Sequence, residues 1–146
     1  MSKNKKIKII LASDHAGFKL KEEIKKFLIK KRKEIMDLGT DSHSSVDYPD
    51  FAHSLAKKIK NDSKLLGILV CGSGIGMDIV ANKHKNIRAA LCYSVKSTRL
   101  SREHNNANVM AIGARLTKKK VALKCVSTFI KTNFKGGRHL RRVRKI

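Results

Sequence analysis

The stretch LGILVCGSGIGM, residues 66–77, decides how this chain is organised. Its apolar start indicates a buried strand, and Cys71 closes that strand. Glycine follows at three alternate positions, Gly72, Gly74 and Gly76, and a helical pattern opens at Ile75. We therefore predict a strand, a tight glycine-rich loop and a helix in direct succession.

This junction favours an ionised thiol. Loop N–H groups and the positive end of a helix dipole stabilise an anion, so we expect a lowered pKa for Cys71. The same amides suit a phosphate or an enediolate oxygen. The loop lacks the Lys-Ser/Thr ending of a P-loop and follows the third strand, which argues against a dinucleotide site. An inert core thiol in a tight turn is the alternative.

Strand and helix patterns alternate along the rest of the chain. Five strands, each followed by a helix, predict an α/β fold: a three-layer α/β/α Rossmann-like domain with a five-stranded parallel sheet. We expect this single domain to span residues 1–146, with a basic tail at 135–146, and Thr117 to cap the last long helix. The expected strands are 7–12, 34–38, 66–71, 87–92 and 109–113, and the expected helices are 18–33, 49–60, 75–83, 95–103 and 117–132.

Composition narrows the class of protein. Three widely spaced cysteines argue against a disulfide framework or a zinc site and suit a reducing cytoplasm. No apolar run is long enough to span a membrane. The basic start, residues 1–6, precedes only a short apolar run that contains Lys8, so we expect no signal peptide.

The net charge of +23 is typical of nucleic-acid binders. The lysines, however, are spread along the whole chain, and aromatic residues, which stack on bases, make up only 5%. A lysine-rich solvated surface is therefore our interpretation, and a basic polyanion-binding module is the alternative. After Glu103 the chain has no acidic residue, and its end is rich in arginine.

In parallel sheets, ligands bind beyond the carboxyl ends of the strands. This rule selects Asp14-His15, the 71–76 loop, Tyr93-Ser94 and Ala114-Arg115. Asp14 and His15 can orient a sugar hydroxyl and a phosphate, unless Asp14 is simply a helix N-cap. No acidic or histidine cluster has the spacing of metal ligands.

Two further groups lie towards the C-terminus. His104-Asn105 can donate and withdraw a proton at a sugar ring oxygen, although a polar helix end and turn is the alternative. Arg138 and Arg142 are four residues apart, so on a helix both guanidinium groups face one way and match a phosphate. A plain basic tail is the alternative.

Together these segments resemble the type B ribose-5-phosphate isomerases and their sugar-phosphate isomerase relatives. Each segment is unspecific by itself, and their joint order and spacing carry the resemblance over essentially the full length. The matching segments are SDHAG (13–17), VDYP (46–49), GILVCGSGIG (67–76), ANK (81–83), LSREHN (100–105), NV (108–109), GAR (113–115) and GGRH (136–139), with Arg142.

The resemblance implies isomerisation between ribose 5-phosphate and ribulose 5-phosphate, in the non-oxidative pentose phosphate pathway, without metal or organic cofactor. It implies that Cys71 moves a proton between C1 and C2, that His104 opens the furanose ring, and that Ser73 with the loop amides stabilises the enediolate. Some relatives carry a glutamate base further along the loop, where this chain has Met77. The implied substrate-binding residues are Asp14, His15, Tyr48, Gly72, Gly74, Ile75, Gly76, Asn105, Arg115, Arg138, His139 and Arg142.

The resemblance also implies a homodimer, or a tetramer, whose active sites lie at the subunit interface, with the tail of one subunit serving its partner. No membrane and no specific nucleic acid is expected as a partner. A six-carbon substrate, galactose 6-phosphate or allose 6-phosphate, is the alternative, because pocket depth rather than any motif separates these enzymes.

Overall fold

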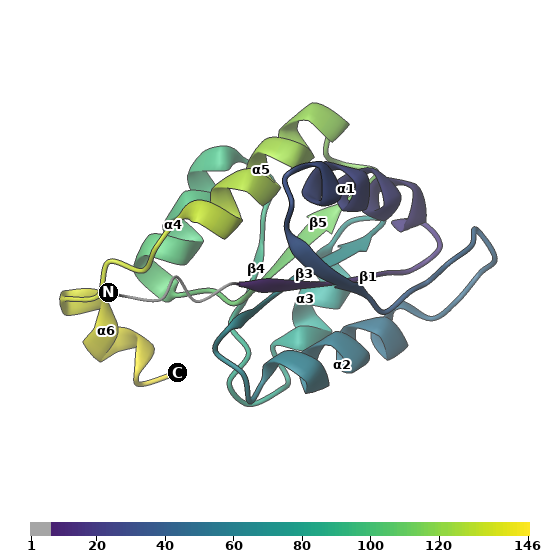
Figure 1. Cartoon of the computed structure of the whole chain (residues 1–146). Helices are drawn as coiled ribbons and strands as arrows, with labels where there is room; N and C mark the ends of the chain where they lie inside the picture. Colours follow the sequence, from purple (N-terminus) through teal and green to yellow (C-terminus); the bar gives the residue numbers. More distant parts are fainter. Residues whose placement is uncertain (1–6) are drawn as a thin grey trace.

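A five-stranded parallel sheet forms the centre of the computed structural model, which describes residues 7–146 (Figure 1). The predicted fold class is confirmed. The basic segment 1–6, on which the prediction of no signal peptide partly depended, lies outside the described residues. In the order in which they lie side by side, the strands are β2 (Glu34–Asp37), β1 (Lys8–Ser13), β3 (Leu65–Cys71), β5 (Val109–Gly113) and β4 (Ala89–Leu91).

Helices cover both faces of this sheet (Figure 1). On one face lie α2 (Tyr48–Ile59) and α3 (Ile75–Ala81), and on the other α1 (Phe18–Lys30), α4 (Val95–Asn105) and α5 (Lys119–Lys131). The tail ends in a short helix, α6 (Arg138–Val143), which lies against α4. None of the helices within residues 7–146 is both long and apolar enough to cross a membrane.

Two apolar cores, one on each face of the sheet, follow from the alternation of side chains along the strands. Along β3, Ile68 and Val70 join the core under α1 and α5, whereas Leu69 and Cys71 join the core under α2 and α3. The position of Cys71 in this alternation therefore sends its thiol towards the α2/α3 face, at the carboxyl end of the central strand.

Most element boundaries differ from expectation by a few residues, and three of the differences have a clear physical reason. The cap expected at Thr117 is wrong: α5 begins at Lys119, Lys118 is its N-cap residue, and no side chain caps it. The fourth strand is only three residues long, since pairing with β5 extends no further than Ala89–Leu91. The second helix begins at Tyr48, with Pro49 in its first turn, where the missing N–H has no helical acceptor.

Candidate functional site

The predicted site residues form two groups, one beyond the carboxyl ends of the parallel strands and one near their amino ends. We call the first the carboxyl edge; it comprises Asp14, His15, Tyr48, the 71–76 loop and Arg115. The second, the tail edge, comprises His104, Asn105, Arg138, His139 and Arg142. From the sequence, we expect all of these residues in one site, and the fold determines which of them lie together in one chain.

The separation follows from the direction of α4. This helix starts beyond the carboxyl end of β4 and runs back along the sheet, so it ends near the amino ends of the strands. Asn106, just after α4, lines one cavity with Leu65 and Leu66, the first residues of β3, whereas Cys71 is the last. A seven-residue strand spans about 20 Å. In Figure 1 the strands accordingly point away from α6.

The glycine-rich loop directs an amide at the thiol of Cys71. The N–H of Gly74 donates to Cys71 Sγ at 3.1 Å. Gly74 has a left-handed backbone (φ +79°), and a methyl group there would come within 2.8 Å of Leu91. In the same loop, the N–H of Ile75 donates to Ser73 Oγ at 3.2 Å. Only glycine therefore provides both the conformation and the space that this amide needs.

Burial raises the pKa of the Cys71 thiol, whose residue is 4% exposed. Backbone N–H groups of Met77, Gly74 and Ser73 act in the opposite direction, and the Asp14 carboxylate adds to the rise. The expectation of a lowered pKa is thus wrong for the single chain. The predicted amides are present, but the loss of solvent around the sulfur outweighs them.

Two side chains from other elements lie directly on this loop. The Arg115 guanidinium crosses Gly72, where a methyl group would be 3.1 Å from Nη1, and the Arg115 N–H donates to the Gly72 carbonyl at 2.9 Å. The Tyr48 ring lies against Gly76, at 2.6 Å from the position of an added methyl group. These glycines therefore let a cation and a phenol approach the backbone that surrounds the thiol.

Asp14 and His15 follow β1 beside this loop. The Asp14 carboxylate accepts the N–H of Gly17 at 2.9 Å, so it caps the turn that leads into α1. His15 Nδ1 accepts the N–H of Val46 at 3.1 Å. The helix N-cap considered for Asp14 is wrong, because Gly17 is the N-cap residue of α1 and no side chain caps that helix. His15 is half-buried and held by the loop that precedes α2.

The tail edge contains a pocket of about 480 Å³, lined by His104, Asn105, Arg138, His139, Arg142, Val143 and Ile146. The His104 and His139 rings stack at 4.2 Å with an interplanar angle of 11°. Desolvation, the neighbouring His104 and the arginines lower the pKa of His139. The left-handed residue that ends α4 is Asn106 (φ +47°), so the turn expected here uses Asn106, while His104 and Asn105 line the pocket.

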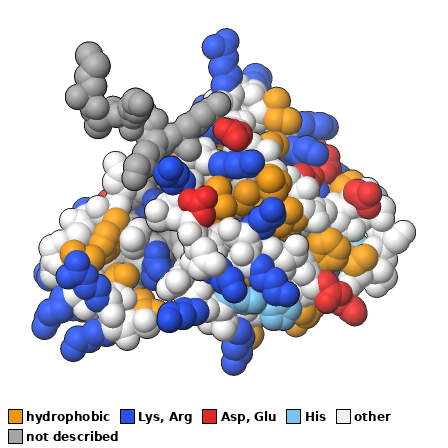
Figure 2. All heavy atoms as spheres, turned by 60° about the horizontal axis from the view of Figure 1, so that its bottom comes forward, with side chains coloured by type: hydrophobic (Ala, Val, Ile, Leu, Met, Phe, Trp, Pro, Cys, Tyr) orange, Lys and Arg blue, Asp and Glu red, His pale blue; other side chains and the backbone are white. Residues whose placement is uncertain are grey.

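The tail docks on the end of α4 through a few contacts. The Lys135 N–H donates to the Glu103 carbonyl at 3.1 Å, and Lys135 Nζ pairs with the Glu103 carboxylate at 3.1 Å. The pocket is cationic, because two arginines and two histidines line it and no Asp or Glu side chain does. Figure 2 shows Lys and Arg side chains gathered at the end of the molecule where α6 lies. Such a pocket suits a phosphate dianion.

Sequence reasoning missed two buried cations that support these edges. Arg102 donates through Nε to the Thr132 carbonyl at 3.1 Å, and so ties the end of α4 to the start of the tail. Lys21 is fully buried beside β2. Arg102 lies inside the matching segment LSREHN, but no role was assigned to it there, and Lys21 had no signal because it is one of many basic residues on its helix. Within residues 7–146, no three His, Cys, Asp or Glu side chains form a group able to hold a metal ion.

Comparison with known proteins agrees with this geometry. A family model described as ribose/galactose isomerase matches residues 9–146. Ribose-5-phosphate isomerase B of Escherichia coli is 40% identical over 139 residues, covering 95% of this chain and 93% of that protein. A crystal structure of a ribose 5-phosphate isomerase from Thermotoga maritima is 49% identical, with a TM-score of 0.92, covering 95% of this chain and 96% of that one.

A third relative was crystallised with a ligand. Ribose-5-phosphate isomerase B from Mycoplasma genitalium, with bound ribulose-5-phosphate, is 45% identical, with a TM-score of 0.92, covering 95% of this chain and 93% of that one. Full-length similarity in both sequence and fold defines a class of α/β sugar-phosphate isomerases. This chain belongs to the ribose/galactose isomerase family within that class.

Proposed function

We propose that this chain interconverts ribose 5-phosphate and ribulose 5-phosphate, with Cys71 as the base. The observation that carries the proposal is the thiol at the end of β3, whose Sγ lies 3.1 Å from the Gly74 nitrogen at the edge where parallel sheets bind ligands. The Mycoplasma genitalium relative with bound ribulose-5-phosphate supports the choice of substrate.

The chemistry needs only the groups present at these two edges. The Cys71 thiolate removes the proton from C2 of the open-chain aldose, and the electron pair moves onto the carbonyl oxygen to give an enediolate. Amides of the 72–76 loop stabilise that oxygen. The thiol then returns the proton to C1, while a hydroxyl proton moves between the two oxygens. His104 gives and takes the proton that opens the furanose ring, and no net oxidation occurs.

We further propose a homodimer in which the carboxyl edge of one subunit faces the tail edge of the other. In one chain, Arg115 lies beside the base, but Arg138 and Arg142 of the tail lie at the opposite end of the strands, so neither edge is a complete site. The cationic tail edge of a partner would also lower the pKa of the Cys71 thiol, which burial raises in the single chain. Residues 1–146 then act as one domain, with 135–146 as the phosphate-binding tail.

A coupled assay on the purified protein tests the function. We expect turnover of ribose 5-phosphate with kcat/KM above that for galactose 6-phosphate and allose 6-phosphate. The six-carbon sugars belong in the panel because the matching family model covers both ribose and galactose isomerases. A preference for either six-carbon sugar would reassign the substrate, and no turnover of any of the three would reject the isomerase.

A further inference from the structure

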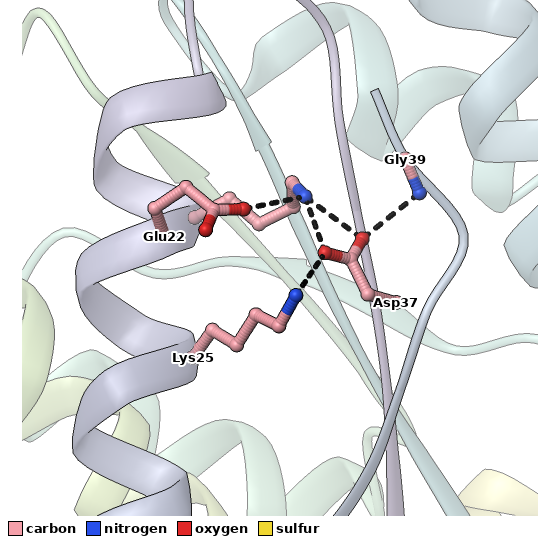
Figure 3. Close-up of polar contacts among 5 residues, drawn as sticks. Glu22, Lys25, Asp37 and Gly39 are labelled. Carbon is pink, nitrogen blue, oxygen red and sulfur yellow. Dashed lines mark hydrogen bonds and ion pairs between the residues drawn. The ribbon is translucent and has the colours of Figure 1, made fainter. Parts of the chain in front are cut away.

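The side chain of Lys21 is buried, and its charged end meets carboxylates that are partly exposed. The side chain is 1% exposed, yet Nζ carries a charge that binds both oxygens of Asp37, at 2.8 and 2.6 Å, and Glu22 at 3.2 Å (Figure 3). Lysine is almost never buried unless it is paired. Replacing such a pair by apolar residues is often neutral for stability, so the pair itself calls for another explanation.

Asp37 gathers three donors at the end of β2. Besides Lys21, it accepts from Lys25 Nζ at 3.2 Å and from the N–H of Gly39 at 2.9 Å (Figure 3). Burial acts to raise the pKa of Asp37, but these hydrogen bonds outweigh it and the pKa is lowered. Asp37 is therefore a carboxylate at neutral pH, and it fixes the backbone just where the chain leaves the sheet.

That backbone pairs directly with the residue before Asp14. The Gly39 carbonyl accepts the N–H of Ser13 at 2.7 Å, and the N–H of Thr40 donates to the Ser13 carbonyl at 2.8 Å. Gly39 has φ +99°, a conformation that glycine adopts readily. The ion pair is thus connected to the end of β1 through two consecutive hydrogen bonds.

A second route from Lys21 reaches the same loop. Its Nζ lies 5.5 Å from the centre of the Phe18 ring, and that centre lies 4.9 Å from the centre of the His43 ring, with the two rings nearly perpendicular. Three residues later, the N–H of Val46 donates to His15 Nδ1 at 3.1 Å. Both the start and the middle of the 38–47 loop are therefore tied to Lys21 before the loop reaches His15.

We propose that the Lys21–Asp37 ion pair is a positioning device for His15, acting through the 38–47 loop. While Nδ1 accepts the Val46 N–H, a neutral imidazole must carry its proton on Nε2. The loop thus selects one tautomer and presents His15 as a hydrogen-bond donor through Nε2. That this donor meets the sugar phosphate rests on the proposed function, whereas the selection of the tautomer does not.

Heteronuclear NMR of the imidazole nitrogens tests the tautomer without any substrate. At about pH 8, where histidine is neutral, we expect the Nε2–H form of His15 in the wild-type protein and a mixture of both forms in Lys21→Met. Asp37→Asn keeps the shape of the side chain and its acceptor for Gly39, so it provides the test if Lys21→Met does not fold. An unchanged single tautomer in the folded variant would overturn the proposal.

Kinetics separates positioning from general loss of stability. We expect Lys21→Met or Asp37→Asn to lower kcat/KM by about tenfold or more, chiefly through KM. The matched control is Ile24→Ala, a fully buried change on the same helix, in the apolar core, that removes no charged or polar group from this ion pair. Equal loss of activity in the control would overturn the proposal. A shifted tautomer in a protein that turns over no sugar phosphate would instead reject the proposed function and keep the positioning device.

Discussion

The two edges of this molecule differ in how closely their backbones are packed. At the carboxyl edge, backbone presses on backbone: a methyl group on Gly17 would lie 2.2 Å from the Val70 carbonyl oxygen, and one on Gly113 would lie 2.5 Å from that of Ser73. At the tail edge, Gly136 and Gly137 have nothing within 4 Å of such a methyl group, and they only redirect the chain. The first edge is defined by close packing and the second by charge.

This difference matches what each half of the proposed site must do. A proton transfer requires a base and an oxyanion donor held in fixed positions, which a close-packed loop at a strand end provides. Binding a phosphate requires mainly positive charge within reach, which α6 provides with two arginines one turn apart. The predictions below test this division, from the largest expected effect to the smallest.

Cys71→Ala removes the base from the close-packed edge. We expect kcat to fall by about 10²–10⁴-fold, the usual share of a general base, while the substrate still binds. The steady-state assay measures the first effect, and calorimetric titration with ribose 5-phosphate measures the second. Cys125→Ala, which removes a fully buried thiol from the opposite core, is the control and should turn over normally. Near-normal turnover in Cys71→Ala would reject this residue as the base.

Mixing two inactive variants tests whether the edges meet between subunits. Cys71→Ala damages one edge and His104→Ala the other, so a mixed dimer has one intact site and one doubly damaged site. After denaturation and refolding of an equal mixture, we expect about a quarter of wild-type activity from random pairing in a symmetric dimer. Mixtures of each variant with itself are the controls. If each chain formed its own site, the mixture would stay inactive.

Substituting glycine compares how much each edge depends on close approach. Gly113→Ala places a methyl group against the Ser73 backbone, and we expect a loss of about 3 kcal/mol in the free energy of unfolding. Gly136→Ala meets open space and carries only the strain of φ +66°, about 1 kcal/mol. Urea unfolding followed by circular dichroism measures both values. Equal losses would contradict the contrast between a packed edge and a charged one.

Arg138→Ala tests the charged edge in turn. Because a phosphate that does not react is bound equally in the ground and transition states, we expect KM to rise by about tenfold with kcat little changed. Arg141→Ala removes the same charge from the same helix, but Arg141 does not line the pocket. It should therefore leave KM near the wild-type value. An equal rise in both variants would mean that net charge, rather than a specific phosphate site, governs binding.

The sequence was enough to predict a parallel sheet, the alternation of strands and helices along the chain, and the residues of both edges. These features depend on local signals, namely the spacing of apolar residues and short motifs. It was not enough to predict the sign of the Cys71 pKa shift, because desolvation depends on how α2 and α3 cover the sulfur. The separation of His104 from Cys71 within one chain follows from the direction of α4. Lys21 and Asp37 are sixteen residues apart, and only the fold makes them a pair.

Asp78 offers a finer probe of the packed edge. It lies in the first turn of α3, just after the glycine-rich loop, and its carboxyl group is partly buried there. Burial raises its pKa to about 6, and its Oδ1 has no hydrogen-bond partner among the described residues. Between 3.8, the ordinary pKa of an aspartate, and about 6, the folded state binds more protons than the unfolded state. Stability should therefore fall as pH rises through that window, and stay low above it.

Asp78→Asn removes this charge and keeps the shape of the side chain. We expect the variant to match the wild-type protein near pH 4, where Asp78 is protonated, and to exceed it at pH 8 by about 1 kcal/mol. Urea unfolding at several pH values measures the difference. Asp50→Asn, at an exposed position on α2, is the control and should leave the pH profile unchanged. If Asp78→Asn gave the wild-type profile, the packed edge would tolerate a buried charge, and its contrast with the tail edge would be weaker than the geometry indicates.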